Sequence, residues 1–166
     1  PQRNSALFLT LSGDVLFENG ELQAALLNYK KALEISDQHF GIWEKVINIQ
    51  ILLGEYKQMI KTGAKALHLH PNQAVIYYYT AFALHRERQN KAALANIKTA
   101  LSITEERKEL RALIYALQAE VLIEERKSAD ADVAFEKAIE NDPLNYLILN
   151  NYAYYLALRN ESLDKA

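Results

Sequence analysis

The histidines of this 166-residue chain are the side chains best suited to hold a metal ion, because cysteine is absent. His68 and His70 stand on either side of Leu69, directly before Pro71. Two residues that are two apart on a helix do not share a face, and a metal ion needs further ligands held nearby. We therefore interpret the pair as groups at the C-terminal end of a helix, where they complement its dipole. The sequence predicts no metal site and no cofactor.

Pairs of carboxylates could serve general acid–base catalysis only if they faced one another. The pairs Glu105-Glu106 and Glu124-Glu125 are adjacent in sequence, so their side chains diverge on a helix and are expected to be solvated. The chain also lacks a glycine-rich phosphate loop, a GxSxG nucleophile elbow and an HExxH zinc motif. We predict no catalytic residues and no enzymatic activity.

Charge and hydropathy argue against two further classes of function. The net charge is −2, which gives no electrostatic reason to expect nucleic acid as a partner. Half of the residues are hydrophobic, yet no run is long and apolar enough to insert into a membrane. The same hydrophobic fraction is sufficient to bury a continuous core.

A repeat with a period of 34 residues organises the chain. Large side chains recur at spacings of 34, 34, 38 and 34 residues, and within each segment apolar residues follow at three- and four-residue steps, which is typical of helices. A fixed period of this length indicates stacked helical units rather than one globular core. The large side chains are Leu9, Trp43, Tyr77, Tyr115 and Leu149.

The residues at each step resemble the tetratricopeptide repeat (TPR) family. Its pattern has a large aromatic residue in a first helix, small residues where two helices cross, and proline at the closing turn. Segment 40–73 matches most fully, with Trp43, Gly54-Glu55-Tyr56, Ala66 and Pro71. The resemblance implies an all-α fold, a right-handed solenoid of antiparallel helix pairs with about four and a half repeats.

The period divides the chain into consecutive repeats of one domain. Because the chain begins at Pro1 and stops inside a repeat, we expect it to be a fragment of a longer protein. The four additional residues before the fourth repeat are strongly helix-forming, so we expect them to add a helical turn. The expected repeats are 6–39, 40–73, 74–107, 112–145 with the helical extension 108–111, and a truncated fifth repeat at 146–166.

The second repeat departs from the others in its second helix. Met59 stands where the other repeats carry alanine, and Gly63, four residues later, stands where they carry a bulky residue. Positions four apart share a helix face, so the large and small residues have exchanged places with volume roughly conserved. The glycine is expected to cost about 1 kcal/mol of helix propensity relative to alanine.

The resemblance also implies a function, since TPR proteins bind partners along a concave groove lined by the first helices. We therefore expect a protein-interaction scaffold that binds a peptide or protein without catalysis. The middle of the expected groove is aromatic, and aromatic residues with polar tips are enriched at interfaces. The candidate anchors are Tyr78, Tyr79, Phe82 and Tyr154, and the candidate hydrogen-bonding groups are Asn48, Asn150 and Asn151.

One specialisation of the family is testable from the residues. Some members hold the acidic C-terminal tail of a chaperone with lysine and asparagine on successive groove faces. The corresponding positions here carry Thr10 and Asp14, then Lys45, then Val75 and Tyr79, and shifting the frame by one repeat does not restore the pattern. We expect an apolar or mixed partner rather than a free chaperone carboxylate.

Other interpretations remain open at this point. The groove could instead pack against helices outside this chain or against another copy, and the domain would then be a structural or self-association module. A homodimer of the fragment could in that case be either a true assembly or an artefact of the missing helices. The domain could also be an arm attached to a catalytic domain. The stretch 149–156 resembles TPR proteins of bacterial cell envelopes, often lipoproteins, which suggests a periplasm-facing location; the alternative is the cytoplasm.

Overall fold

The computed structural model describes residues 2–104 and 106–159, and all of the regular structure in these two ranges is α-helical. The all-α fold expected from the repeat is thereby confirmed for the described part of the chain. The helices are α1 (Gln2–Glu18), α2 (Leu22–Ile35), α3 (Phe40–Leu52), α4 (Tyr56–Leu69), α5 (Ala74–Arg86), α6 (Asn90–Ser102), α7 (Lys108–Glu124), α8 (Ser128–Asn141) and α9 (Tyr146–Leu158).

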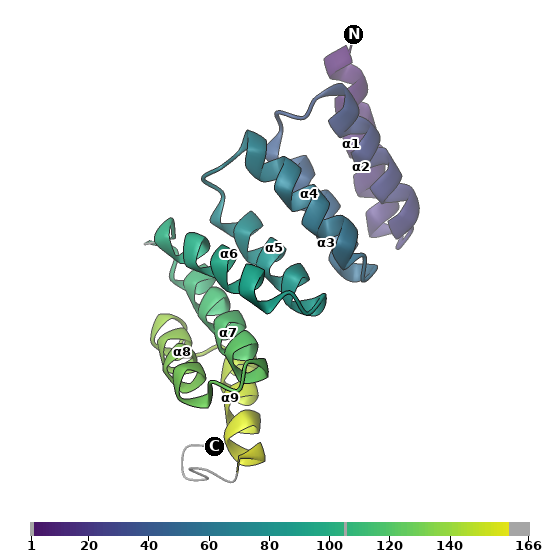
Figure 1. Cartoon of the computed structure of the whole chain (residues 1–166). Helices are drawn as coiled ribbons and strands as arrows, with labels where there is room; N and C mark the ends of the chain where they lie inside the picture. Colours follow the sequence, from purple (N-terminus) through teal and green to yellow (C-terminus); the bar gives the residue numbers. More distant parts are fainter. Residues whose placement is uncertain (1, 105, 160–166) are drawn as a thin grey trace.

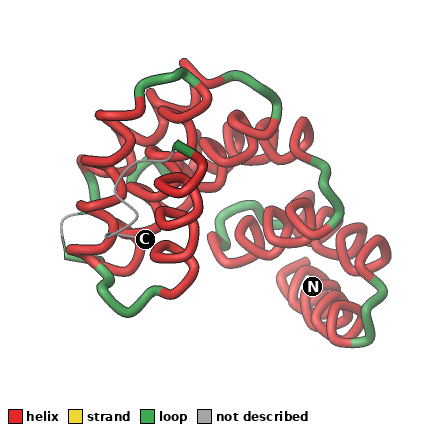
Figure 2. The backbone as a smooth tube through the Cα atoms, turned by 90° about the horizontal axis from the view of Figure 1, so that it is seen from below, coloured by secondary structure: helices red, strands yellow, loops and turns green. Residues whose placement is uncertain are grey.

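Consecutive helices form pairs that stack into a curved array. Figure 1 shows the pairs following one another from the N-terminus to the C-terminus, and Figure 2 shows the array bending into an open arc. The first helices α5 and α7 contact each other directly across a repeat boundary, as expected on the tighter side of a bend. We call the surface of α1, α3, α5, α7 and α9 the inner face, and the surface of α2, α4, α6 and α8 the outer face.

The core is a succession of four apolar clusters rather than one centre. Each cluster joins a helix pair to the first helix of the next pair, so every repeat is completed by its neighbour. Fully buried alanines mark the points where helices approach closely: Ala25, Ala32, Ala66, Ala93, Ala100, Ala131 and Ala138. Bulky side chains such as Tyr29 and Phe135 fill the space between these points.

The turn inside each pair repeats one backbone geometry. Gly20, Gly54, Arg88 and Arg126 all have positive φ, at 80°, 68°, 61° and 60°. After each of them the next N–H donates back to a carbonyl of the preceding helix, as from Glu55 to Gln50 O at 2.8 Å. This is the Schellman arrangement that ends a helix, and it favours glycine at the left-handed position. Repeats three and four adopt it with arginine.

The four additional residues before the fourth repeat extend a helix. α7 has 17 residues, whereas α3, α5 and α9 have 13 each, and its additional turn lies at its N-terminal end. Arg111 anchors this end by donating to Leu101 O at 3.3 Å and to Thr104 O at 3.2 Å. The guanidinium thereby satisfies carbonyls that the end of α6 leaves without a helical partner.

Gly63 allows α4 and α5 to approach closely. A Cβ atom at this position would lie 2.2 Å from Thr80 Oγ1, so Thr80 occupies the space that a bulky residue fills in other repeats. Met59, one turn earlier, is fully buried. The exchange of large and small residues in the second repeat therefore involves a third residue from the next repeat.

We predict that Gly63→Ala lowers the free energy of unfolding by about 1 kcal/mol, because overpacking against Thr80 outweighs the gain in helix propensity. Urea denaturation followed by circular dichroism measures the change. Thr80→Ala in the same chain removes the clashing hydroxyl and should reverse the loss.

The matched control is Gly41→Ala in α3, where a Cβ atom meets nothing within 4 Å. It should leave stability unchanged or raise it by up to about 1 kcal/mol. Equal effects of Gly63→Ala and Gly41→Ala would contradict the close approach of α4 and α5.

We predict that Arg126→Gly raises the free energy of unfolding by about 1 kcal/mol, because glycine adopts the positive φ of this turn without steric cost. Arg88→Gly should raise the free energy of unfolding by less, since Arg88 also forms a 2.8 Å ion pair with Glu124 that the substitution removes. Thermal denaturation of both variants tests this order. A loss of stability in Arg126→Gly would show that the arginine makes a compensating contact.

Candidate functional site

Exposed apolar side chains gather on the first helices. Most of the large hydrophobic residues that the described structure leaves exposed lie in α1, α3, α7 and α9, and few lie in second helices. An exposed apolar surface of this kind marks an interaction site more often than it marks ordinary surface. The residues in first helices are Leu7, Phe8, Leu11, Val15, Phe17, Leu52, Leu113, Tyr146, Leu147, Leu149, Tyr154 and Leu158.

Tyr78, Tyr79 and Phe82 lie together on α5, at the middle of the inner face. All three are half-buried and pack against the apolar clusters on either side of α5, so they contribute to the core as well as to the surface. The rings of Tyr78 and Tyr79 are 5.4 Å apart, and Phe82 meets Tyr56 edge-on at 5.9 Å. The structure therefore brings the three central candidates into one aromatic group.

The hydroxyl groups of these tyrosines remain protonated over a wide pH range. Burial raises the pKa of Tyr78 to about 12, and Tyr79 and Glu120 contribute to the increase. Burial also raises the pKa of Tyr79, with a smaller contribution from Glu44. Each ring can therefore present an apolar surface and a hydrogen-bond donor to a partner.

The candidate residues of α9 differ in their surroundings. Tyr154 is 59% exposed and Asn150 is exposed, whereas Asn151 is half-buried and donates to Glu120 Oε1 at 3.3 Å. Burial raises the pKa of Glu120, although the bond from Asn151 and the charges of His85 and Arg86 oppose the increase. Asn151 thus bridges α9 and α7 within the chain.

Asn48 is exposed and lines a hollow of about 330 Å³ between α1 and α3. Asp14 lies in the same hollow and accepts hydrogen bonds from Tyr29 Oη at 2.6 Å and Lys45 Nζ at 2.5 Å. Burial acts to raise the pKa of Asp14, but the bonds from Lys45 and Tyr29 outweigh it and hold the pKa below its ordinary value. The hollow therefore contains a carboxylate that stays charged.

Sequence reasoning missed the Asp14–Lys45 and Glu120–Asn151 contacts between neighbouring first helices, although the sequence carries a signal for them. Asp14 and Lys45 are 31 residues apart, and so are Glu120 and Asn151. A separation of 31 residues is one repeat less about one helical turn. Two residues at this separation therefore lie on neighbouring first helices and face each other on the inner face. Polar pairs at this offset could have been searched for once the period was known.

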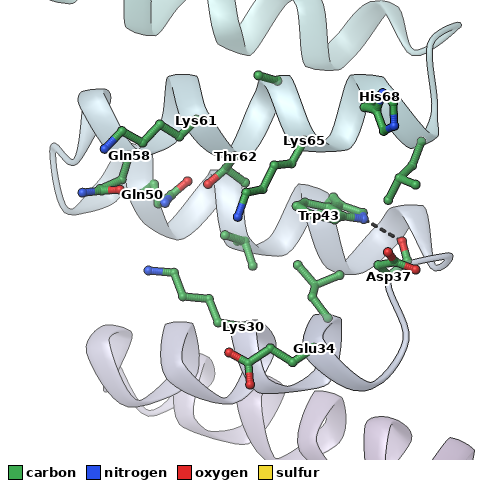
Figure 3. Close-up of a pocket in the computed structure, with 14 residues that line it drawn as sticks. Lys30, Glu34, Asp37, Trp43, Gln50, Gln58, Lys61, Thr62, Lys65 and His68 are labelled. Carbon is green, nitrogen blue, oxygen red and sulfur yellow. Dashed lines mark hydrogen bonds between the residues drawn. The ribbon is translucent and has the colours of Figure 1, made fainter.

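A second feature that sequence reasoning missed is a groove of about 760 Å³ on the outer face, between α2 and α4. Trp43 and Gln50 of α3 lie on its floor, between Lys30 of α2 and Lys61 of α4 (Figure 3). Trp43 lies on this floor and donates its indole N–H to Asp37 O at 2.8 Å. We call it the outer groove; it is lined by Lys30, Leu33, Glu34, Asp37, Trp43, Val46, Gln50, Gln58, Lys61, Thr62, Ala64, Lys65, His68 and Leu69.

Within the described ranges, no three histidine, aspartate or glutamate side chains converge so that they could hold a metal ion. His68 lies in the last turn of α4 and His70 directly follows that helix. Over the same ranges, no helix combines the length and the apolar character needed to cross a lipid bilayer.

Known structures share this fold at low sequence identity. MamA (residues 41 to the end) from Desulfovibrio magneticus RS-1 superposes with a TM-score of 0.82 at 17% identity, over 97% of this chain and 89% of that chain. PilF from Pseudomonas aeruginosa gives 0.80 at 18% identity, over 99% and 73%. YrrB, described as a TPR protein with an unusual peptide-binding site, gives 0.65 at 23% identity, over 95% and 82%.

Sequence comparison adds one independent finding. The family model of the tetratricopeptide repeat matches residues 134–166. No curated protein sequence matches the chain significantly. The 34-residue period, the stacked helix pairs and the family-model match over residues 134–166 agree with one another, and the described part of the chain has the all-helical solenoid fold of tetratricopeptide-repeat proteins.

Proposed function

We propose that the inner face binds a segment of a partner protein, as an extended peptide or a helix, without catalysing a reaction. The observation that carries this proposal is the concentration of exposed apolar side chains on the first helices. Proteins rarely leave such a surface to water unless it binds a partner. TPR proteins act in general as interaction scaffolds, and the description of YrrB as a peptide-binding TPR protein supports this choice.

The centre of the proposed site is the aromatic group of Tyr78, Tyr79 and Phe82. Because these rings are already packed on one side, a partner would bury their free side at little additional cost in side-chain entropy. Leu52 and Tyr154 extend the apolar surface toward either end and are 60% and 59% exposed. These five residues are proposed as the anchors.

Polar groups around the anchors would orient the partner. Asn48 and Asn150 are exposed and can bond to a partner backbone, whereas Asn151 would first have to exchange its bond to Glu120. Asp14 and Lys45 place opposite charges in the hollow beside Asn48. Such a surface suits an apolar or mixed segment better than a free carboxylate terminus.

A second candidate function is self-association. Exposed apolar residues are most numerous on the outermost helices, α1 and α9, and these could pair with another copy or with other helices of the same protein. Sedimentation at increasing protein concentration separates this function from peptide binding. A dimer that dissociates when exposed apolar residues of α1 or α9 are substituted would favour self-association.

We predict that Leu52→Asp combined with Tyr154→Asp reduces the recovery of inner-face partners to about one tenth in affinity capture from cell extract, because each change buries a charge in an apolar contact. Both positions are exposed, so the variant should unfold at the same temperature as the native chain. Quantitative mass spectrometry of the captured proteins provides the measurement.

The matched control is Leu27→Asp with Val133→Asp, two residues of second helices that are 52% and 50% exposed. This variant carries the same added charge on the outer face and should retain the partners. If the two variants capture the same proteins in the same amounts, the inner face is not their binding site.

A further inference from the structure

We propose that the outer groove binds a short, extended, acidic peptide segment of a partner protein, at a site separate from the inner face. The two sites use opposite sides of α3. Lys45 and Asn48 line the hollow on the inner side, while Trp43, Val46 and Gln50 form the floor of the outer groove. One helix thus contributes to two independent surfaces.

The shape of the outer groove suits an extended chain. Its lining follows α4 from Gln58 to Leu69, a length of about 16 Å. A segment in β conformation advances about 3.3 Å per residue, so about five residues fit along this length. Leu33, Ala64 and Leu69 line the groove and remain at least partly exposed, so they can provide apolar contacts for side chains of such a segment.

The walls of the outer groove carry an excess of positive charge. Lys61 and Lys65 are one turn apart on α4, and Lys30 reaches toward them from α2 (Figure 3). Among the described residues, none of these lysines lies within ion-pair distance of a carboxylate. The chain as a whole has a net charge of −2, so this cationic wall is a local feature that complements an acidic segment.

Gln50 supplies a second and independent observation. Its side chain lies on the floor of the outer groove and is only 1% exposed, yet its Oε1 atom has no hydrogen-bond partner. Buried carbonyl oxygens are nearly always bonded, so an unpartnered one calls for an explanation. A small turn of the Gln50 amide toward the groove would bring Oε1 within reach of a backbone N–H of a bound extended segment, which would provide the missing donor.

The same features disfavour nucleic acid as the occupant. Glu34 and Asp37 lie at one end of the outer groove and would repel a continuous phosphate backbone. An acidic peptide can place an apolar or neutral residue beside them and its carboxylates beside the lysines. The apolar floor likewise has no counterpart in a sugar–phosphate chain.

The test uses a fluorescein-labelled synthetic peptide of alternating aspartate and leucine, with fluorescence anisotropy as the readout. We expect Lys61→Glu combined with Lys65→Glu to weaken binding by about tenfold or more, because attraction becomes repulsion at two contacts. The matched control, Lys91→Glu with Lys98→Glu, changes the charge equally at exposed positions of α6 and should leave affinity within about twofold.

Three results would overturn the proposal: no binding of the peptide to the native chain, equal weakening by both charge-reversal variants, or equally tight binding of an oligonucleotide of the same charge. The variant Leu52→Asp with Tyr154→Asp should keep its affinity for this peptide. Failure of the inner-face proposal and failure of this one are therefore distinguishable.

The role of Gln50 has its own measurement. Methionine has nearly the shape of glutamine without its amide, so Gln50→Met should leave the melting temperature unchanged or raise it while weakening peptide binding by about fivefold or more. If Gln50 had a merely structural role, the substitution would lower the melting temperature and leave peptide binding unchanged. Unchanged affinity in this variant would contradict the proposed bond to the peptide backbone.

Discussion

Each helix pair of this chain can bury its apolar side only against the next pair. The clusters around Tyr29, Met59, Ile97 and Phe135 all include residues from the following first helix, and none is complete within one repeat. The other features depend on this nearest-neighbour burial. It sets the distance between repeats, requires small residues where helices cross, and orders every first helix on one side of the array.

The stacking also explains why two polar contacts on the inner face have the same sequence separation. Asp14–Lys45 and Glu120–Asn151 both join residues that are 31 positions apart, one turn short of a repeat. A rigid stack keeps such pairs in register, so each bond supports a neighbouring pair without being part of the apolar core. The inner face consequently combines fixed polar contacts with aromatic side chains that are partly exposed, and the proposed binding of a partner segment rests on this combination.

Local departures from the repeat are absorbed by the neighbouring repeat. Gly63 is compensated by Thr80 of α5, and the additional turn of α7 is anchored by Arg111 on the end of α6. The departures leave the stacking intact because each interface can adjust separately. The repeats also present different surfaces: the outer groove is lined by α2, α3 and α4, whereas the aromatic group of the inner face lies on α5.

The sequence by itself determined the period, the all-helical class and the residues at the helix crossings, because these follow from side-chain size and spacing along one chain. Tyr78, Tyr79 and Phe82 were identifiable as neighbours for the same reason. Only the tertiary structure decided that Asn151 is bonded to Glu120, and that Tyr29 and Lys45 converge on Asp14. It also decided that the side-chain oxygen of Gln50 lies buried without a hydrogen-bond partner on the floor of the outer groove. Those features depend on which faces of separate repeats meet. A repeat pattern fixes the spacing of the helices, but it does not fix the direction in which each side chain points between them.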